Sequence, residues 1–288
     1  MDTRTVYTIC PEFEAVTPVF CPKPDAGGRP RTTPGYPSWA VLHLPHDSRY
    51  IPAEVRDQFL LDDSELGREV LRMTDHRTAD LFGAHRTSGR VARAPVSRLV
   101  VDVERFSDDA LEPMAAAGMG AVYTQTSSNR PLRRFLEMPE REALLERWYR
   151  PHHRRLEHLV EDVLRQHGRA FVLDAHSFPS RPLPYERDAF PDRPDICIGT
   201  DPFHTPAALR DAFVNGIASE GFRVAVDTPF SGALVPARHY RRDPRVQSVM
   251  VEVNRRLYLD EATGLPAEDF AEVAATVQAC CIAALAGL

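Results

Sequence analysis

The sequence contains few cysteines, and none has the spacing of a structural metal site. The five cysteines (Cys10, Cys21, Cys197, Cys280 and Cys281) are odd in number and include no CxxC pair. A disulfide framework or zinc knuckle is therefore not expected, and a reducing cytoplasm is the expected location. Cys197, between isoleucines, and the Cys280–Cys281 pair, in an alanine-rich segment, are expected to be buried core residues.

Other classes of protein are excluded by what the chain lacks. No apolar run approaches the length of a transmembrane helix, and the N-terminal MDTRTVYTICPEFE has early acids and no apolar signal core. The formal net charge of −6 argues against nucleic acid as a main partner. Neither GxGxxG nor GxxxxGK[ST] occurs, so a NAD- or ATP-binding domain is poorly supported. We expect a soluble protein with no membrane partner; its oligomeric state is left open.

The order of predicted elements indicates the fold class. Residues 1–37 are rich in proline, glycine and threonine and are expected to form an irregular N-terminal arm. In residues 38–288 strands and helices alternate, which predicts a single α/β domain: a sandwich with a central mixed, mostly parallel sheet. Strands are expected at 39–44, 98–104 and 170–174, and in FRVAVD and SVMVEVNR. Helices are expected at 62–85 and 139–167, in TPAALRDAFVNGIASEG, and at the C-terminal end.

Two segments are expected to be long loops. The stretch 106–138 contains glycine, serine, asparagine and proline clusters, and SFPSRPLPYERDAFPDRPD is dense in proline. Long excursions from a compact domain often form binding loops or lids.

Three buried-strand patterns end in residues suited to metal or acid–base chemistry. VLHLPHDS contains His46, FVLDAHS contains His176, and VMVEVNR contains Glu252. In open α/β sheets, ligands bind outside the carboxyl ends of the strands. Neutral imidazoles are common ligands of catalytic zinc, which takes three protein ligands, so a carboxylate must be the third. Asp174 precedes His176 by two residues and could orient its imidazole from the same side of the strand.

Six blocks occur in an order that resembles the N-formylglutamate amidohydrolase family. They are PHDSRYIP, TDHRTADLF, VVDVERFSDD, DAHSFPS, DTPFSGALVPARHY and VEVNRRLYLDE, and they extend from about residue 41 to 261. The family is similar in fold to zinc carboxypeptidases and zinc-dependent cell-wall amidases. The resemblance therefore implies a three-layer α/β sandwich with a metal at the carboxyl ends of the central strands.

The resemblance also implies roles for individual residues. His46 and His176 match the metal histidines, and Glu252 looks like the late glutamate that serves as general base. The third ligand in the carboxypeptidases lies three residues after the first histidine, but here that residue is Arg49, which cannot bind a metal. Asp75 in TDHRTADLF is the favoured counterpart, as in the amidase branch, and Glu104 in VVDVERF is its rival. Zinc is the expected metal, although iron, manganese or cobalt could use the same ligands.

An acidic N-acyl substrate requires cationic groups near the metal. Arg105 is the leading candidate, since a guanidinium meets a carboxylate with two parallel hydrogen bonds. Arg255 follows Glu252 by three residues and faces away unless the strand has ended. The complete set expected to bind substrate is Arg105, Arg238, Tyr240, Asn254 and Arg255.

These residues predict a zinc-dependent amidohydrolase that removes formyl or another small acyl group from an acidic amino acid such as N-formyl-L-glutamate. The chain departs from the family pattern at SGALVPARHY, VERF and GMGAVYTQT, which leaves the exact substrate open. One alternative is a zinc peptidase or cell-wall amidase on the same scaffold, against which the lack of an export signal weighs. Another is a binding protein whose catalytic set has decayed; the presence of His46, His176 and Glu252 weighs against it.

Overall fold

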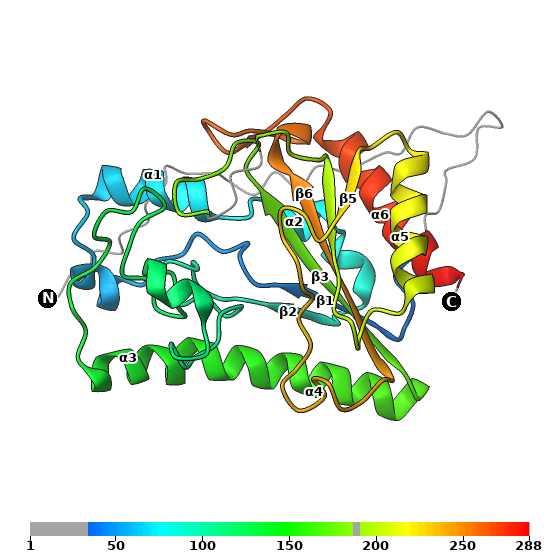
Figure 1. The fold of residues 1–288 in the computed structure, drawn as a ribbon, viewed down its shortest axis with the longest axis horizontal. Coiled ribbons are helices and arrows are strands. Elements are labelled where there is room, and N and C mark those ends of the chain that lie inside the picture. The colour runs from blue at the N-terminus through cyan, green and yellow to red at the C-terminus, as the bar shows by residue number, and fades with distance from the viewer. Residues whose placement is uncertain (1–33, 187–190, 288) are drawn as a thin grey trace, which may run out of the picture.

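A six-stranded β-sheet lies at the centre of the computed structural model, which describes residues 34–186 and 191–287 (Figure 1). Its strand order is β2-β1-β3-β6-β4-β5, and only the β4–β6 pair is antiparallel. The mixed, mostly parallel sheet is thus confirmed. The expected N-terminal arm, apart from residues 34–37, lies outside the described residues. The strands are β1 (Ala40–Leu44), β2 (Val91–Arg93), β3 (Ala170–Phe178), β4 (Ile196–Gly199), β5 (Val224–Val226) and β6 (Val246–Asn254).

Helices cover both faces of this sheet. Helix α4 runs along one face, and α2, α5 and α6 pack on the other, while α1 and α3 lie to one side (Figure 1). The helices are α1 (Asp63–Met73), α2 (Thr78–Leu81), α3 (Met138–Leu144), α4 (Arg150–His167), α5 (Ala207–Ser219) and α6 (Phe270–Ala286). Short 3₁₀ turns occupy Ala53–Gln58, Ala84–Thr87, Pro113–Ala117 and Arg255–Leu257, and a two-stranded hairpin is made by β7 (Leu259–Asp260) and β8 (Leu265–Pro266).

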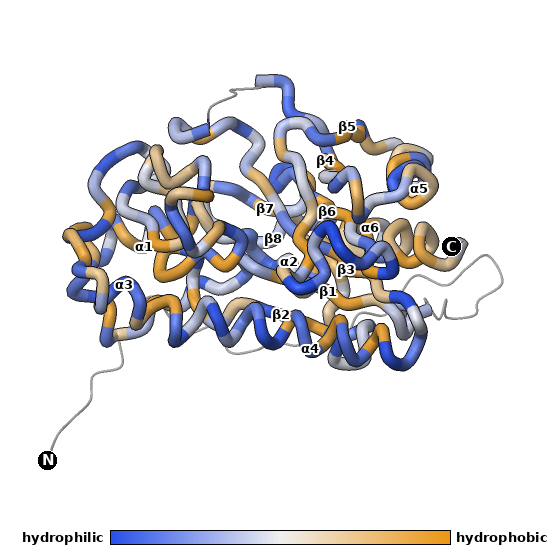
Figure 2. The backbone as a smooth tube through the Cα atoms, turned by 60° about the horizontal axis from the view of Figure 1, so that its bottom comes forward, coloured by the Kyte–Doolittle hydropathy of each residue, from blue (hydrophilic) through white to orange (hydrophobic). Residues whose placement is uncertain are grey.

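Side-chain alternation along the strands divides the core between the two faces. Leu42 of β1 and Leu173 of β3 pack in the cluster that includes α5 and α6, whereas Val41 and Val172 pack with α4. Helix α4 has the matching amphipathic pattern, because hydrophilic and hydrophobic segments alternate along its length (Figure 2). Each strand therefore presents every second residue to the α4 face. His176 has the same parity as Val172 and belongs to that face.

The strand predictions are partly wrong. Residues 98–104 form no strand, although Leu99–Val103 are fully buried. Their backbone turns instead: the Val100 N–H donates to the Ser97 carbonyl (2.8 Å) and the Asp102 N–H to the Ala121 carbonyl (2.8 Å). An apolar run reports burial and cannot by itself distinguish a strand from a buried turn. Strands β2 and β4 were not expected, and β3 continues four residues beyond the predicted end, to Phe178.

Both long predicted helices are interrupted. The helix expected at 62–85 ends at Met73, and Arg77 has a left-handed backbone (φ 59°) before α2 begins. The helix expected at 139–167 contains a π-helical turn at Leu145–Tyr149, between α3 and α4. Such turns insert one residue and often accompany functional sites. The first interruption places Asp75 between two helices, where its side chain can leave the helical path.

The structure also bears on the expectations about the cysteines and about membrane-spanning helices. Cys197, Cys280 and Cys281 are free and buried, which confirms them as core residues. Within residues 34–186 and 191–287, no helix has both the length and the apolar character needed to cross a bilayer.

Candidate active site

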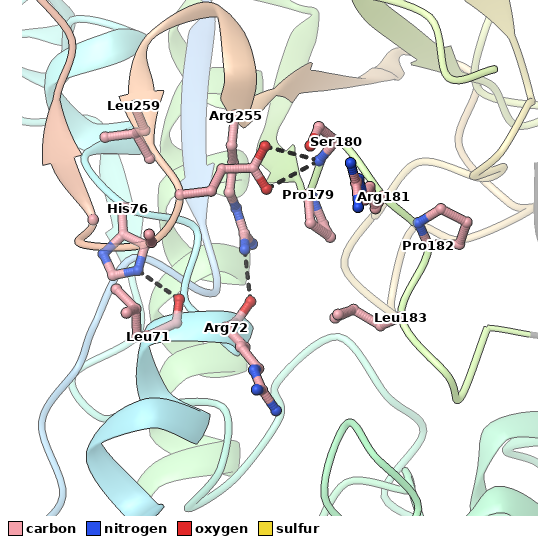
Figure 3. A pocket seen from close by; sticks show the side chains of 13 residues that line it. Leu71, Arg72, His76, Pro179, Ser180, Arg181, Pro182, Leu183, Arg255 and Leu259 are labelled. Atoms are coloured by element: carbon pink, nitrogen blue, oxygen red, sulfur yellow. Dashed lines mark hydrogen bonds between the residues drawn. The ribbon is translucent and has the colours of Figure 1, made fainter. Parts of the chain in front are cut away.

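Two adjoining cavities open where β1, β3 and β6 end. The first has a volume of ≈ 240 Å³, and the second, of ≈ 350 Å³, is shown in Figure 3. The first cavity brings together most of the residues that the sequence singles out, which come from distant parts of the chain. Its ionisable lining residues include His46, Asp75, Glu104, His176 and Glu252, and its arginines are Arg72, Arg98, Arg105 and Arg255.

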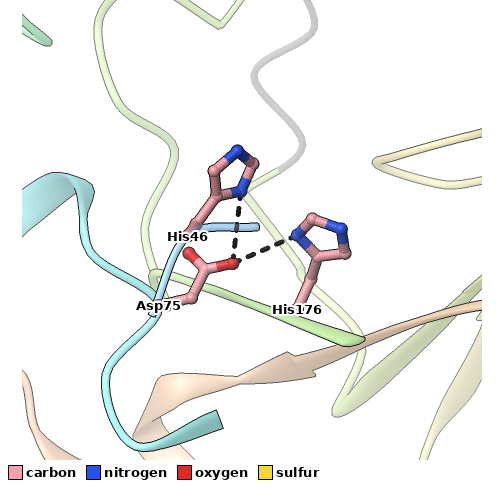
Figure 4. Close-up of side chains that lie close together, drawn as sticks. All are labelled: His46, Asp75 and His176. Carbon is pink, nitrogen blue, oxygen red and sulfur yellow. Dashed lines mark hydrogen bonds and ion pairs between the residues drawn. The ribbon is translucent and has the colours of Figure 1, made fainter. Parts of the chain in front are cut away.

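His46, Asp75 and His176 form a compact group in this cavity (Figure 4). The Asp75 Oδ2 atom lies 3.6 Å from His46 Nδ1 and 3.1 Å from His176 Nδ1. All three residues are buried, with exposed fractions of 3%, 2% and 3%. Two imidazole nitrogens therefore converge on one carboxylate oxygen away from bulk water.

Local backbone structure explains this convergence. His46 follows β1, and the Asp75 N–H, beyond the end of α1, donates to the His46 carbonyl (3.0 Å). His176 lies within β3, on the strand next to β1. The Ser177 N–H also donates to Asp75 Oδ2 (3.2 Å). Asp75 is thus attached to both histidine segments, through its own N–H to the His46 carbonyl and through its carboxylate to the Ser177 N–H.

The group fits a divalent cation. Ligand atoms about 2.0–2.2 Å from a tetrahedral zinc ion lie roughly 3.3 Å apart, close to the separations of Asp75 Oδ2 from the two Nδ1 atoms. His46 Nδ1 is buried and has no hydrogen-bond partner in the part of the chain that the structure describes. Two imidazoles and one carboxylate are also the donor types that zinc prefers.

Carboxylates on the far side of each imidazole leave its Nδ1 atom free to bind a cation. Asp102 Oδ1 lies 2.9 Å from His46 Nε2, and Asp174 Oδ1 lies 3.1 Å from His176 Nε2. A proton held on each Nε2 leaves the Nδ1 lone pair available. The sequence predicts this arrangement for Asp174. It misses Asp102, because the apolar run predicts a strand that ends in the candidates Glu104 and Arg105.

Charge pairing governs protonation in the group. Burial would raise the pKa of Asp75, but the neighbouring His176, His46 and Arg255 outweigh it and hold that pKa well below its ordinary value. Burial would lower the pKa of His176, but Glu104 and Asp174 outweigh it and raise that pKa well above its ordinary value. The cavity therefore stabilises positive charge beside these carboxylates, as a cation site must.

Glu252 lies beside this group on the next strand. It pairs in register with His176 across the parallel strands β3 and β6. Its Oε2 atom is buried without a hydrogen-bond partner among the described residues. Burial, together with the nearby Asp75 carboxylate, raises the pKa of Glu252 to about 7. A carboxyl group with this pKa can both accept and release a proton near neutral pH.

Glu104 and Asp174 form a second group with His43, behind His176. His43 Nδ1 lies 2.8 Å from Asp174 Oδ1 and 3.4 Å from Glu104 Oε1. Glu104 Oε2 lies 3.3 Å from His176 Nε2, on the opposite side of the ring from Asp75. This geometry favours Asp75 over Glu104 as the partner of the two Nδ1 atoms.

Among the residues expected to bind substrate, Arg105 lines the first cavity with unsatisfied donors. Its side chain is 25% exposed, and its nearest described carboxylates, Asp102 and Glu112, lie at 3.8 Å. Its side chain makes no hydrogen bond to a described residue, and its buried Nε atom has no hydrogen-bond partner among them. A mostly buried guanidinium in this state suits an anionic ligand.

Arg255 also lines this cavity, because β6 ends at Asn254 and the chain turns there. Its guanidinium is occupied, however: Nη2 donates to Asp75 Oδ1 (3.0 Å), Nη1 to the Arg72 carbonyl (2.6 Å) and Nε to Ser177 Oγ (3.2 Å). It fixes Asp75 rather than presenting a free donor pair to substrate.

The other three expected substrate residues lie elsewhere. Arg238 is 65% exposed and its Nη1 pairs with Glu161 Oε1 of α4 at 2.7 Å. Tyr240 stacks on His204. Asn254 is fully buried, and its Nδ2 donates to the Pro194 carbonyl (3.0 Å). None of the three is among the described residues that line the first cavity, and the Asn254 amide is held instead by the Pro194 carbonyl.

The start of helix α4 holds the segment that carries Arg105. The Tyr149 hydroxyl, in the π-helical turn, donates to the Arg105 carbonyl (2.8 Å), and His153 Nε2 lies 2.9 Å from the Val103 carbonyl. His152 Nε2 lies 2.8 Å from His43 Nε2. This irregular segment therefore depends on α4 for its position.

Comparisons with known proteins agree with these observations. The family model for N-formylglutamate amidohydrolase matches residues 38–259. An N-formylglutamate deformylase from Pseudomonas putida is 27% identical over 230 residues, covering 77% of this chain and 82% of its own.

Two solved structures share the fold. The N-formylglutamate amidohydrolase from Ralstonia eutropha JMP134 superposes with a TM-score of 0.73 at 22% identity, over 86% of this chain and 93% of its own. The gene product Atu2144 from Agrobacterium tumefaciens gives 0.60 at 20% identity, over 86% and 91%. With the family model covering most of the chain, this protein belongs to the N-formylglutamate amidohydrolase family.

Proposed function

We propose that this protein is a metal-dependent amidohydrolase that cleaves a small N-acyl group, such as formyl, from an acidic amino acid such as glutamate. The observation that carries the proposal is one cavity lined by His46, Asp75, His176, Glu252 and Arg105. It combines a candidate cation site, a carboxyl group with a pKa near neutrality and an unsatisfied guanidinium. Family membership supports the same reaction.

His46, Asp75 and His176 would hold the cation through Nδ1, Oδ2 and Nδ1. When bound, zinc supplies a water of lowered pKa and polarises the amide carbonyl. Asp102 and Asp174 keep the two imidazoles in the required tautomer, and Arg255 holds Asp75 in place.

Glu252 is the proposed general base. Its carboxylate takes a proton from the attacking water and returns it to the departing nitrogen. The register of β3 and β6 keeps Glu252 beside the ligand His176, so that the reacting water can contact both the base and the metal site.

Arg105 is the proposed partner of a substrate carboxylate. Its side chain makes no hydrogen bond to a described residue, only ion pairs at 3.8 Å with Asp102 and Glu112, and it is mostly buried in the cavity wall. A bidentate contact there would orient the amide toward Glu252.

Formate release from N-formyl-L-glutamate by purified protein tests the proposal. The measurement is made as isolated, after treatment with a chelator, and after zinc is added back. Chelator-sensitive release that zinc restores is the expected result. Formate release that continues after the metal has been removed completely would contradict the proposed role of the metal in hydrolysis. No release from any N-acyl amino acid by the metal-loaded protein would favour a binding protein instead.

A further inference from the structure

The described residues that line the second cavity include none of the proposed metal ligands, nor Glu252 or Arg105. This cavity has a volume of ≈ 350 Å³ and shares Arg72, Pro179, Leu183 and Arg255 with the first cavity. The two spaces therefore meet at these four residues. Together they offer more room than N-formylglutamate needs, and Arg105 lines only the first of them.

The walls of the second cavity are largely apolar. The loop Pro179–Leu183 forms one side, and Leu71, His76 and Leu259 form the other (Figure 3). The His76 Nε2 atom lies 2.8 Å from the Leu71 carbonyl oxygen, so its imidazole is already engaged by the protein. These surfaces suit a short chain of methylene groups.

Guanidinium groups supply the cavity's available charge. Arg181 is exposed and makes no hydrogen bond or ion pair with any residue the structure describes. Arg72 makes one side-chain hydrogen bond, from Nη1 to Ser128 Oγ (3.3 Å). The charge of Arg255 is compensated by Asp75. Glu261 is the one carboxylate among the described lining residues.

Both oxygens of Glu261 accept the Ser180 N–H, at 3.1 Å each (Figure 3). Arg72 and Arg181 thus outnumber this acid, and the cavity carries a net positive charge. An apolar chain that ends in an anion matches both its walls and its charge.

The relative position of the two cavities indicates which part of a substrate enters the second. If the amino-acid carboxylate binds Arg105 and the scissile amide lies beside Asp75 and His176, which line only the first cavity, the acyl group is the part of the substrate left to extend past the shared residues Arg72 and Arg255. A formyl group ends at the carbonyl carbon and leaves the second cavity unused.

We propose that the second cavity binds an acyl group longer than formyl that ends in a carboxylate, such as succinyl, with Arg181 as its partner. This inference rests on the proposed function. The reaction is the same hydrolysis: the amide C–N bond breaks and a C–O bond forms. One proton of water passes to the nitrogen, giving a dicarboxylic acid and the free amino acid.

The test compares kcat/KM for three substrates: N-formyl-, N-succinyl- and N-pentanoyl-L-glutamate. The pentanoyl chain has a similar length without the terminal charge. The variants are Arg181→Met, which keeps length and removes charge, and the control Arg165→Met, at an exposed position on α4. In the wild type, N-succinyl-L-glutamate is expected to exceed the pentanoyl substrate by about tenfold, the effect of one charge-assisted contact.

Arg181→Met should remove that about tenfold preference and leave the formyl substrate within about twofold of wild type. Arg165→Met should change neither substrate. Equal losses for all three substrates in Arg181→Met, or no succinyl preference in the wild type, would overturn the inference while formyl hydrolysis upholds the proposed function. Failure with every substrate would count against the proposed function itself.

One further substrate tests the orientation. N-formyl-L-glutamyl-L-glutamate is longer on the amine side. If Arg181→Met impairs this compound and spares N-succinyl-L-glutamate, the second cavity binds the amine side and the acyl assignment is wrong.

Discussion

His176 and Glu252 lie opposite each other on the neighbouring parallel strands β3 and β6. Paired residues on adjacent strands project from the same face of a sheet, so the register alone places the proposed ligand beside the proposed base. A slip of one residue would turn Glu252 to the α5–α6 side, where Val251 and Val253 pack. The catalytic arrangement is therefore a property of strand pairing as much as of residue identity.

The metal ligands can be distinguished by metal content. His46→Ala, His176→Ala and Asp75→Asn should each purify with less than about a tenth of the wild-type metal, because each removes one of the three proposed ligands. Glu104→Gln should retain it, since Glu104 faces His176 Nε2 rather than the Nδ1 atoms. Elemental analysis of the purified variants decides the point. Full occupancy in Asp75→Asn with loss in Glu104→Gln would reverse the assignment.

Glu252→Gln should keep its metal and its fold but lose turnover. The amide cannot accept the proton of the attacking water, and removal of a general base costs about 10²–10⁴ in kcat. Steady-state kinetics with matched metal analysis provide the measurement. Wild-type turnover in this variant would remove Glu252 from the mechanism.

Activity should depend on pH through the same residue. Burial raises the pKa of Glu252 to about 7, and the base must be deprotonated to act, so kcat/KM should fall as the pH drops below that value. The positive charge of a bound cation stabilises the carboxylate and shifts this acidic limb to lower pH. A profile from pH 5 to 9 gives the limb. A rate that is flat or that rises toward acid over this range would contradict the role.

Arg105→Met should weaken substrate binding. A charged hydrogen-bond pair is worth about 1.5–3 kcal/mol, so kcat/KM for N-formyl-L-glutamate should fall roughly 10- to 100-fold. Arg238→Met is the matched control, since Arg238 is exposed and paired with Glu161, and it should leave the kinetics unchanged. An equal loss in both variants would exclude a specific role for Arg105.

Tyr149→Phe should act through Arg105. The variant removes the hydrogen bond to the Arg105 carbonyl, worth about 1 kcal/mol, and should lower kcat/KM several-fold. In the double variant with Arg105→Met the second loss should largely disappear, because the two residues act on one contact. Fully additive effects would show that Tyr149 contributes only to general stability, which thermal unfolding measures in parallel.

The strand-end residues were predictable because their chemistry and their local pattern coincide. His46, His176 and Glu252 each stand at or near the end of an apolar run, and parallel strands bring such ends to one edge of a sheet. The mixed sheet and its covering helices follow from the same alternation of elements.

Other features depend on tertiary contacts that no local pattern reports. Asp102 lies in an apolar run that resembles a strand, yet it turns toward His46 and is held by Arg98. Tyr149, which donates to the Arg105 carbonyl, lies in a π-helical turn. Arg238 and Tyr240 share a loop that the motif comparison favoured, but the loop directs them to α4 and His204. The sequence alone does not show which of these long side chains are buried or in which direction they point.

The interrupted helix between α1 and α2 also links metal binding to the integrity of the whole chain. Asp75 lies at this interruption. It contacts His176, which is 101 residues away in the sequence, and Arg255, which is 180 residues away. An unfolded chain cannot hold these groups together, so a cation that binds them stabilises only the native state. At a free metal concentration one hundred times its dissociation constant, that stabilisation reaches about 2.7 kcal/mol. Thermal melting with and without each candidate metal can therefore rank the metals by affinity before any substrate is known.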